Sequence, residues 1–462
     1  MNRFMQLVAL IALAQWAGAI EVTTTPGQLS SLIEDTSIES LTVGGQMDAR
    51  DFQYIASELT SLTTLDLSGA TIVGYSDPSQ PLSGSLYAFE AGTLPHTLLM
   101  GMRLEHIELP GSLVAIGYAA LAGCDRLTSI TLPPSVKRIG DYAFSGSSLE
   151  SIVIPATVDT VGRGAFAHCF ALRQATIGAS VVGDMAFVGD SVLRNVQLGE
   201  GVHDIGTEAF HGTAIQSLDA SQATALSSLG GWAAASTPLI SVSLPQGMAT
   251  MGEGALFGTT ELSAIALPRA LQQIPDYAFA GGSKIVADSI LHEGISRIGD
   301  YAFYNWSDTR HFFLPSTLSY LGTRAMAGMT TLEQIDIAAH QVPALGEDVW
   351  QGVDQPSVKL GTPDNAAAAL YAAAEQWQRF YILHDYLLGD VNGDGTVDVS
   401  DINLMANYIL GKPVEPFIIQ AADVDVSGSV DVTDINIVVN IVLGKVDEPT
   451  VRRINSHNPS NR

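Results

Sequence analysis

One six-residue block recurs along the middle of the chain and constrains the fold more than any other feature. Its clearest copies read Ile-Gly-x-x-Ala-Phe from Ile139 and Val-Gly-x-x-Ala-Phe from Val161. Related copies run from Ile116 to Leu321, with a mean spacing of about 23 residues. A single copy of this length cannot bury its own apolar face, whereas stacked copies form one continuous core. The repeat therefore predicts a solenoid with one coil per copy.

Each repeat contains a second block in which apolar residues alternate before a proline, as in 127–133 and 149–155. This alternation predicts a short strand with one inward face, which the proline ends. The six-residue block is expected to form the opposite wall of each coil. Its glycine would allow a tight corner, and its alanine and phenylalanine would fill the space between coils.

The full repeat reads Ile-Gly-x-x-Ala-Phe-x-x-Cys-x-x-Leu-x-x-Ile-x-Ile-Pro and resembles the BspA-like leucine-rich repeats of bacterial surface proteins. Two copies depart from it, with Ala234 in place of Phe and Pro275 in place of Gly. Asp288 falls where an inward Ile is expected, so we expect a distorted coil near Ile285. The resemblance covers roughly residues 35–383 and implies a β-rich leucine-rich-repeat solenoid.

The N-terminus has the features of a secretory signal peptide. A positively charged start is followed by an apolar run over 4–16 and by a small-residue cleavage site, Ala17-Gly18-Ala19. The alternative interpretation is a buried N-terminal helix. No later apolar run reaches 18 residues, so no membrane span is predicted. We therefore expect a secreted or cell-surface protein.

Composition excludes some partners. Charged residues make up 15% of the chain, and 48 acidic against 21 basic residues give a net charge of −27. Such a chain repels phosphate backbones, so nucleic acid and anionic membranes are poor partners. The two cysteines, Cys124 and Cys169, share a repeat phase but lie two coils apart, about 10 Å at the usual strand spacing. That exceeds the reach of a disulfide, so both are expected to be buried small residues.

The outward positions of the predicted strands form the candidate ligand face. Their side chains are mostly small, hydroxylated or amide-bearing and almost uncharged, which suits binding of protein or glycan through many weak hydrogen bonds. The alternative is a plain solvated sheet surface. The candidate residues are Gln174, Thr176, Asn195, Gln197, His311 and Phe313.

Two twelve-residue segments near the C-terminus, 390–401 and 423–434, carry oxygen donors at positions 1, 3, 5, 9 and 12 with glycine at position 6. This is the pattern of a Ca²⁺-binding loop, in which position 7 supplies a backbone carbonyl. The sequence therefore predicts two Ca²⁺ sites, the second weaker because Ser427 stands at position 5. The expected ligands are Asp390, Asn392, Asp394, Thr396, Asp398 and Asp401, then Asp423, Asp425, Ser427, Ser429, Asp431 and Asp434.

Each loop leads into an expected helix, 402–410 and 435–443, and the two units lie 33 residues apart. Duplicated loop-then-helix units resemble a type I dockerin. The resemblance implies Ca²⁺ binding and a cohesin-like partner that contacts loop positions 10 and 11, here Val399 and Ser400, then Val432 and Thr433. The alternative is docking of this module on the solenoid. Because eight carboxylates crowd the two loops, we expect the module to fold only with metal.

The fold class is therefore α+β: a leucine-rich-repeat solenoid followed by a small α-helical, Ca²⁺-binding, dockerin-like domain. The expected segments are a signal peptide (1–19), a capping region with the first repeats (20–110), the solenoid (111–342), its closing segment (343–384), the dockerin-like domain (385–448) and a polar tail (449–462).

No catalytic motif stands out, so the chain is not expected to be an enzyme. The resemblance implies a non-catalytic binding protein of the adhesion type. The alternative is a non-catalytic subunit of a polysaccharide-degrading, cellulosome-like complex. A solenoid that is itself a hydrolase ranks below both.

Overall fold

The computed structural model describes most of the chain, and most of the predicted signal peptide and tail lies outside the described residues. Two compact units form: 1–309 with 320–331 and 345–353, and 310–319 with 332–344 and 354–462. The described residues are 18–77, 88–282, 284–285, 290–383, 386–414, 417–425, 427, 429–445 and 451–452.

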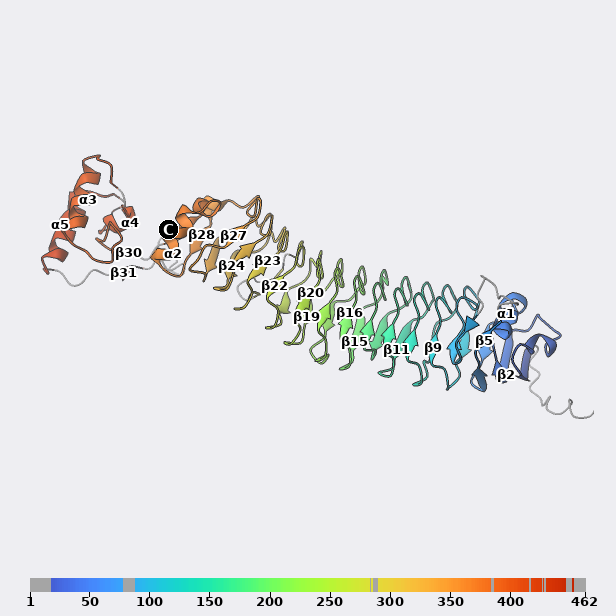
Figure 1. Cartoon of the computed structure of the whole chain (residues 1–462). Coiled ribbons are helices and arrows are strands. Elements are labelled where there is room, and N and C mark those ends of the chain that lie inside the picture. The colour runs from blue at the N-terminus through green and yellow to red at the C-terminus, as the bar shows by residue number, and fades with distance from the viewer. Residues whose placement is uncertain are drawn as a thin grey trace, which may run out of the picture. The chain divides into compact units, whose positions relative to one another are not determined.

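The repeats fold into a β-solenoid, as the 23-residue period predicts, and the solenoid has about 15 coils (Figure 1). Before the regular repeats, a parallel sheet accompanies the helix α1, and β5 and β6 form an antiparallel pair. These elements are β1 (Ala19–Thr24), η1 (Leu29–Ser31), β2 (Ser40–Met47), α1 (Ala49–Glu58), β3 (Thr64–Asp66), β4 (Ala70–Ile72), β5 (Tyr75–Ser76), β6 (Ala88–Phe89) and β8 (His106–Glu108).

The six-residue blocks form one wall of the coils, made of two-residue parallel strands. One sheet consists of β7 (Thr93–Leu94), β9 (Ala115–Ile116), β10 (Arg138–Ile139), β12 (Thr160–Val161), β14 (Val181–Val182), β16 (Asp204–Ile205), β18 (Ser228–Leu229) and β20 (Thr250–Met251). The next consists of β22 (Gln273–Ile274), β23 (Arg297–Ile298), β25 (Tyr320–Leu321) and β27 (Ala344–Leu345).

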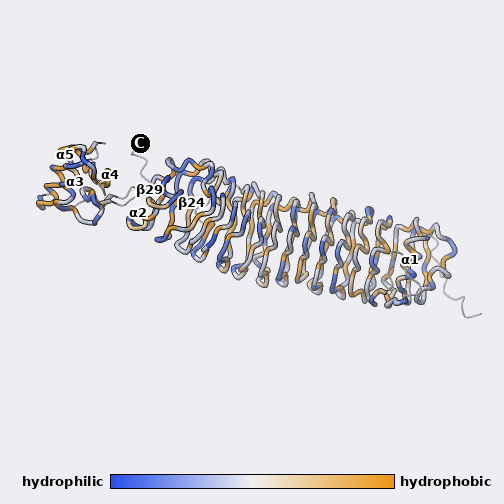
Figure 2. Tube along the Cα trace, turned by 45° about the horizontal axis from the view of Figure 1, so that its top comes forward, coloured by the Kyte–Doolittle hydropathy of each residue, from blue (hydrophilic) through white to orange (hydrophobic). Residues whose placement is uncertain are grey.

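The second blocks form longer parallel strands whose side chains alternate between buried and exposed, as predicted. Hydrophobic and hydrophilic segments accordingly alternate within the coils (Figure 2). One sheet holds β11 (Ser151–Ile154), β13 (Gln174–Ile177) and β15 (Asn195–Leu198), and the next β17 (Ser217–Asp219), β19 (Ser241–Ser243) and β21 (Ala264–Ala266). The last holds β24 (His311–Leu314), β26 (Gln334–Ile337), β28 (Lys359–Gly361) and β29 (Tyr381–Leu383).

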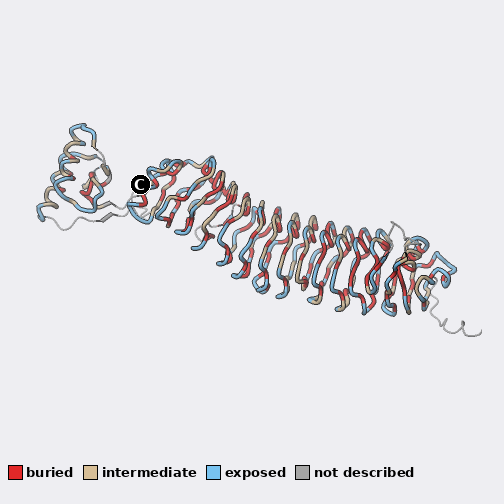
Figure 3. The backbone as a smooth tube through the Cα atoms, viewed as in Figure 1, coloured by how far each residue is buried: buried red, intermediate tan, exposed pale blue. Residues whose placement is uncertain are grey.

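A ladder of phenylalanines fills the space between coils, as predicted. Phe144, Phe166, Phe187 and Phe210 are fully buried and stack in order, with ring centroids 5.1, 5.1 and 5.5 Å apart. Buried segments recur in coil after coil (Figure 3). Each coil thus completes the core of its neighbours, which is how a repeat array gains stability.

The glycine of the block allows the backbones of successive coils to approach closely. The prediction that it forms a tight corner was wrong. Gly140 has no left-handed φ, but a Cβ at this position would lie 2.8 Å from the backbone carbon of Gly117 in the preceding coil. The left-handed conformation instead occurs two residues later, as at Tyr142 with φ of 56°. The amide of Gly140 donates to the carbonyl of Ile116 at 2.8 Å, and this bond recurs between successive coils.

Pro275 interrupts this series of hydrogen bonds between successive coils. Gly252 and Gly299 donate to the carbonyls of the preceding coils, Leu229 and Ile274. Proline has no N–H to donate, and the sheet ends at β20 and starts again at β22. On the other wall, the sheet that ends at β21 is also separate from the one that starts at β24. The expected distortion near Ile285 falls at this break, although Asp288 itself lies outside the described residues.

In seven successive coils, the same repeat position carries a buried side chain that can form hydrogen bonds. The free thiols of Cys124 and Cys169 are buried here and donate to the carbonyls of Leu99 and Phe144, so the prediction of two unbridged cysteines is confirmed. Burial raises the pKa of both thiols to about 12. The other side chains at this position are Ser147, Asp190, Thr213, Thr237 and Thr259.

Asp190 is the one acid in this column. Its Oδ1 accepts the amide of Cys169 at 2.8 Å, while Oδ2 has no hydrogen-bond partner in the described part of the chain. Burial raises the pKa of the Asp190 carboxyl to about 9. A protonated carboxyl carries no charge, which explains how an acid fits among the buried, uncharged side chains above and below it.

The last elements close the solenoid and build a small helical module. The module has a core of five buried residues. They are Val391, Met405, Ala421, Ala422 and Val438. Strand β31 pairs antiparallel with β30 and lies beyond the predicted boundary at 448. The elements are η3 (Gln355–Ser357), α2 (Asn365–Ala373), η4 (Trp377–Arg379), β30 (Tyr386–Leu387), α3 (Val399–Ile409), α4 (Ile419–Ala422), α5 (Val432–Val442) and β31 (Val451–Arg452). No helix among the described residues is long and apolar enough to cross a membrane.

Candidate metal centre and binding surfaces

Loop position 9 begins each helix of the module. Asp398 is the N-cap of α3 and accepts the amide of Ser400, while the position-12 side chain of Asp401 accepts the amide of Asp398. Asp431 and Asp434 repeat this capping box at α5. The helices therefore begin three residues earlier than predicted, because the acid at position 9 satisfies backbone donors of the first turn.

The carboxylates at position 12 organise both loops. Asp401 is fully buried and accepts the amides of Val391 and Asn392, at 2.9 and 3.2 Å, besides that of Asp398. Burial raises the pKa of the Asp401 carboxyl, and the nearby Asp390 carboxylate adds to the effect. Asp434 makes the equivalent bonds in the second loop. Each carboxylate thus joins the start of its loop to the start of the helix.

The second loop brings three carboxylates together. One oxygen from each of Asp423, Asp425 and Asp434 lies within 4.8 Å of the other two. Like charges held this close favour a cation between them, and oxygen donors of this kind suit Ca²⁺. Ser427 lies beside them and donates through its amide to Asp423 and through its hydroxyl to the carbonyl of Ser429. The donor set therefore fits the predicted ion.

The first loop curls around its first acid in the same way, and its position 3 is the side-chain amide of Asn392. The carboxylate of Asp390 accepts the amides of Gly393, Asp394 and Gly395. The side-chain amide of Asn392 donates to Asp394, whose other oxygen accepts both the amide and the hydroxyl of Thr396. These bonds lower the pKa of the Asp394 carboxyl, those from Thr396 most. The loop therefore presents an ionised acid at position 5.

The predicted partner-contacting residues lie on the surface. Val399 and Val432, at loop position 10, are 59% and 61% exposed. The hydroxyl of Ser400 donates to Asp398 at 2.6 Å, and Thr433 is exposed at the matching place. Sequence reasoning missed Leu410 and Leu443, which are 69% and 58% exposed at the ends of α3 and α5. The duplicated position of these leucines, one residue before a helix-ending glycine, is the signal that could have found them.

Four of the six candidate ligand-face residues lie together. In the register of β13 and β15, Gln174 is opposite Asn195 and Thr176 opposite Gln197. All four side chains are exposed, and the Thr176 hydroxyl lies 3.5 Å from the Gln197 amide oxygen. They form a polar, uncharged patch on the strand face, which offers hydrogen bonds without a fixed charge.

The structure does not bring His311 and Phe313 to this patch. Both are half-buried on β24, in a different sheet. Between them Phe312 points into the core and is fully buried. They remain outward positions of the strand pattern, but they do not extend the patch of β13 and β15.

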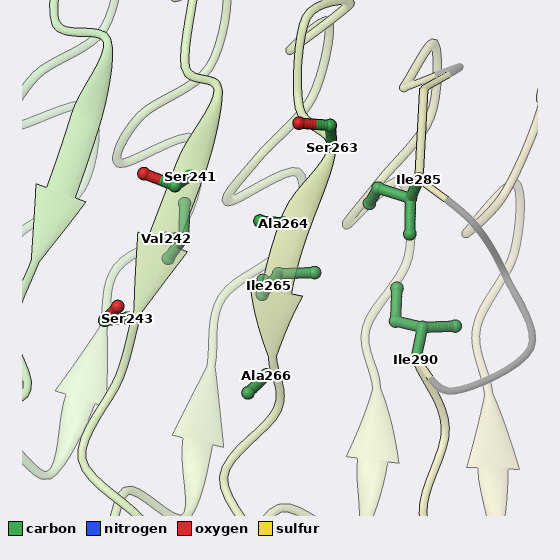
Figure 4. A pocket seen from close by; sticks show the side chains of 9 residues that line it. All are labelled: Ser241, Val242, Ser243, Ser263, Ala264, Ile265, Ala266, Ile285 and Ile290. Atoms are coloured by element: carbon green, nitrogen blue, oxygen red, sulfur yellow. The ribbon is translucent and has the colours of Figure 1, made fainter.

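A hollow of about 450 Å³ lies on the strand face at the end of the second long-strand sheet (Figure 4). Serines 241, 243 and 263 supply hydroxyls, and Ile265, Ile285 and Ile290 supply apolar walls. The small side chains of Ala264 and Ala266 on β21 leave room for the hollow. It marks the place where the regular strand ladder stops.

The sequence families agree with this architecture. The BspA type leucine rich repeat region matches in six copies, over 93–216, 177–286 and 228–355, which together exceed half of the chain. The chain belongs to the family of BspA type leucine-rich-repeat proteins. Residues 388–443 match the dockerin type I domain, whose members bind calcium. The recognition made from the sequence is therefore confirmed in both parts.

Solved leucine-rich-repeat structures are similar to the chain. A leucine-rich repeat protein from Bacteroides ovatus ATCC 8483 is 20% identical, with a TM-score of 0.46, over 60% of this chain and 84% of that one. A leucine rich cell surface protein from Faecalibacterium prausnitzii A2-165 is 20% identical, with a TM-score of 0.30, over 65% and 79%. The pneumococcal vaccine antigen PcpA is 13% identical, with a TM-score of 0.33, over 74% and 72%. No curated protein matches the chain.

Proposed function

We propose that the protein is a secreted or cell-surface, non-catalytic binding protein that attaches to a protein partner through its Ca²⁺-loaded C-terminal module. The observation that carries this proposal is the group of Asp423, Asp425 and Asp434 at the start of α5. Both matched families are non-catalytic. In this proposal the solenoid recognises protein or glycan, and the module provides the attachment.

Ca²⁺ would neutralise the crowded carboxylates of each loop and fix the loop against its helix. The first loop would hold the ion with Asp390, Asn392, Asp394, Thr396, Asp398 and Asp401, and the second with Asp423, Asp425, Ser427, Ser429, Asp431 and Asp434. Because Asp398 and Asp431 cap helices, their carboxylates serve the ion and the helix start together. The ordered helices would then present Val399 and Val432 to the partner.

A cohesin-like protein is the partner that the dockerin match favours. The matched region, 388–443, lies within the proposed module, 385–448. A cohesin on a polysaccharide-degrading scaffold would make this chain a non-catalytic subunit of that complex. A cohesin or another receptor on a cell surface would make it an adhesin. The proposed signal peptide, 1–19, suits either setting.

Calorimetric Ca²⁺ titration of the full chain tests the metal sites. We expect two binding events, with Asp401→Ala removing one and Asp434→Ala the other. Capture of immobilised cohesins, with and without EDTA, tests the partner. Val399→Asp with Val432→Asp is expected to abolish capture while both Ca²⁺ events remain. Loss of Ca²⁺ binding in that variant, or capture unaffected by EDTA, would contradict the proposal.

A glycan array probed with the full chain tests the strand face. We expect substitution of Gln174 and Gln197 by alanine to remove the signal if this polar patch is the site. A positive array without cohesin capture would favour adhesion, and cohesin capture without glycan binding would favour the complex subunit.

A further inference from the structure

A run of aromatic side chains covers part of the solenoid surface away from the strand face. We call it the aromatic column, consisting of Trp232, Phe257, Tyr277, Tyr301 and Tyr304. All five side chains are half-buried, so each exposes part of its ring system to solvent. Trp232, Tyr277 and Tyr301 occupy the fourth position of their six-residue blocks, in the left-handed conformation, with φ of 55°, 56° and 55°. The repeat itself therefore places them in line.

The rings contact one another from coil to coil. The centroid of Trp232 lies 5.1 Å from that of Phe257 and 6.1 Å from that of Tyr277. Tyr277 and Tyr301 stack at 4.9 Å with an angle of 3° between their planes, and Tyr304 meets Tyr301 at 5.6 Å. The column is thus a continuous surface that extends over four coils, and not a set of separate exposed residues.

Glycine in one coil makes this continuity possible. Gly254 occupies the column position between Trp232 and Tyr277, and a Cβ there would lie 2.7 Å from the indole ring. The indole therefore lies across the backbone of Gly254 and reaches towards Tyr277. Gly164 gives the ring of Tyr142 the same room earlier in the solenoid. The difference is that no second aromatic residue follows Tyr142 at the column position, because Met185 stands there.

Carboxylates line the aromatic column. Asp276 and Asp300 precede Tyr277 and Tyr301 in the chain, and each uses Oδ1 to accept a backbone amide of the next coil, at 2.7 and 2.8 Å. These bonds hold the two acids at the surface. Partial burial raises the pKa of the Tyr277 phenol, and Tyr301, Glu253, Asp276 and Asp300 add to the effect. The column therefore combines aromatic surface, phenol hydroxyls and negative charge.

The chain already shows which group this combination accepts. The guanidinium of Arg324, from the coil after Tyr301, donates to the Tyr301 hydroxyl at 3.3 Å and pairs with Asp348 at 3.5 Å. Elsewhere in the solenoid, Arg297 lies over the ring of Tyr320 at 4.1 Å. Guanidinium groups are planar and weakly hydrated, so they combine contact with aromatic rings and hydrogen bonds to acids.

We infer that the aromatic column binds a basic segment of a protein partner, with arginine side chains against the rings and their guanidinium groups paired with Glu253, Asp276 and Asp300. The methylene stems of arginine suit the half-buried rings, and the net charge of −27 attracts such a segment from solution. The inference deepens the proposed recognition role of the solenoid, but it uses a face other than the strand patch and does not involve the Ca²⁺ loops.

Titration of the full chain with hexa-arginine tests the inference, with saturating Ca²⁺ present so that the loop carboxylates are occupied. Hexa-citrulline, the neutral analogue, is the control peptide. Trp232 is half-buried, whereas Trp306, Trp350 and Trp377 are buried, and Trp16 lies outside the described residues. The part of the emission change that disappears in Trp232→Phe therefore reports on the column. We expect hexa-arginine to change this emission and hexa-citrulline to leave it unchanged.

Matched variants separate the column from the general negative charge. Glycine occurs naturally at the column position, so Trp232→Gly with Tyr277→Gly preserves the coil geometry. By calorimetry this pair is expected to weaken hexa-arginine binding about fivefold or more, the effect of removing two cation–aromatic contacts. Tyr142→Gly is expected to leave binding unchanged. Similarly, Glu253→Gln should weaken binding at least about twofold, whereas the distant Glu150→Gln should not.

Equal weakening by both members of either pair would overturn the inference, because binding would then follow net charge alone. Equal binding of hexa-citrulline, or binding of neutral cellohexaose in place of hexa-arginine, would overturn it as well. None of these results would change the Ca²⁺ titration or the cohesin capture, so failure of the inference is distinguishable from failure of the proposed function.

Discussion

The solenoid and the C-terminal module use acidic side chains in opposite ways. In the solenoid, Asp141 and Asp184 each accept one backbone amide from the next coil, so the acids are spaced along the surface. In the module, Asp423, Asp425 and Asp434 converge within 4.8 Å. Spaced acids are satisfied by backbone amides, whereas converging carboxylates repel one another and favour a bound cation. The comparison therefore predicts that one acidic chain contains both a metal-independent part and a metal-dependent part.

The hydrophobic cores of the solenoid and the module also differ in how far each can stabilise its region without metal. The solenoid core continues from coil to coil through stacked phenylalanines. The module has five fully buried core residues, of which two are alanines. Small domains with so little apolar burial generally need a metal or another cross-link to be stable. We therefore expect bound metal to stabilise the module in the way that stacking of neighbouring coils stabilises the solenoid.

Removal of Ca²⁺ by a chelator is expected to have the largest effect on stability. If the chelator had no effect, the contrast between the two regions would be wrong. In excess EDTA, the unfolding transition of the module should disappear from a calorimetric scan, while that of the solenoid stays in place. Ca²⁺ at about 1,000 times its dissociation constant stabilises the module by about 4 kcal/mol for each site. A scan indifferent to chelator would show that the acids of the two regions do not differ in this respect.

Shortening the phenylalanine ladder should come next. Phe187→Ala removes a fully buried ring between Phe166 and Phe210 and is expected to destabilise the solenoid by about 3–5 kcal/mol. Denaturant unfolding followed by circular dichroism measures the loss. Phe170→Ala, at a residue 64% exposed, is the control and should change stability by less than about 0.5 kcal/mol. Similar losses in both variants would deny that the ladder carries the core.

A smaller effect should follow from Asp190, whose pKa is about 9 in the folded protein against an ordinary value of 3.8. Between these values the folded state holds a proton that the unfolded chain releases. Its contribution to stability is therefore complete below about pH 4 and falls by up to about 1.4 kcal/mol per pH unit as the pH rises to about 9.

Asp190→Asn should remove this pH dependence, as measured by melting temperatures at pH 5, 6.5 and 8. The control is Asp184→Asn, which changes an exposed acid of the same coil and should leave the dependence in place. Parallel pH profiles for the wild type and Asp190→Asn would mean that the buried carboxyl is ionised in the folded protein. The column of donors between coils would then need another explanation.

Much of the fold could be predicted because the repeat states its own constraints. Period, inward strand faces and the cysteine phase all follow from residue spacing, and the departure at Pro275 falls where the sheet is interrupted. The predicted role of the glycine in the six-residue block was wrong, because the spacing of residues in the sequence does not show how closely the backbones of two coils approach. The aromatic column was not predicted from the sequence. Trp232 and Tyr277 belong to coils that are not adjacent, and their rings make contact because Gly254, in the coil between them, has no side chain.

The sequence was sufficient to propose the Ca²⁺ ligands, but not the helix caps or the arrangement of the strand-face residues. Ligand spacing depends on a local loop, so the sequence alone is enough to propose it. The use of Asp398 and Asp431 as helix caps was missed, because a ligand position and a cap position are occupied by the same residue type. The separation of His311 and Phe313 from the patch on β13 and β15 depends on which strands share a sheet, and the outward pattern of each strand does not contain that information.

The break at Pro275 also has a mechanical consequence. In a repeat array each coil is held by its neighbours, so cooperativity is transmitted only as far as the inter-coil bonds continue. At Pro275 one of these bonds is missing, while others continue across the boundary, such as the bond from the amide of Gly254 to the carbonyl of Asp276 at 2.8 Å. If the solenoid is pulled along its axis, we therefore expect the coils on either side of Pro275 to separate at a lower force than coils that keep every bond.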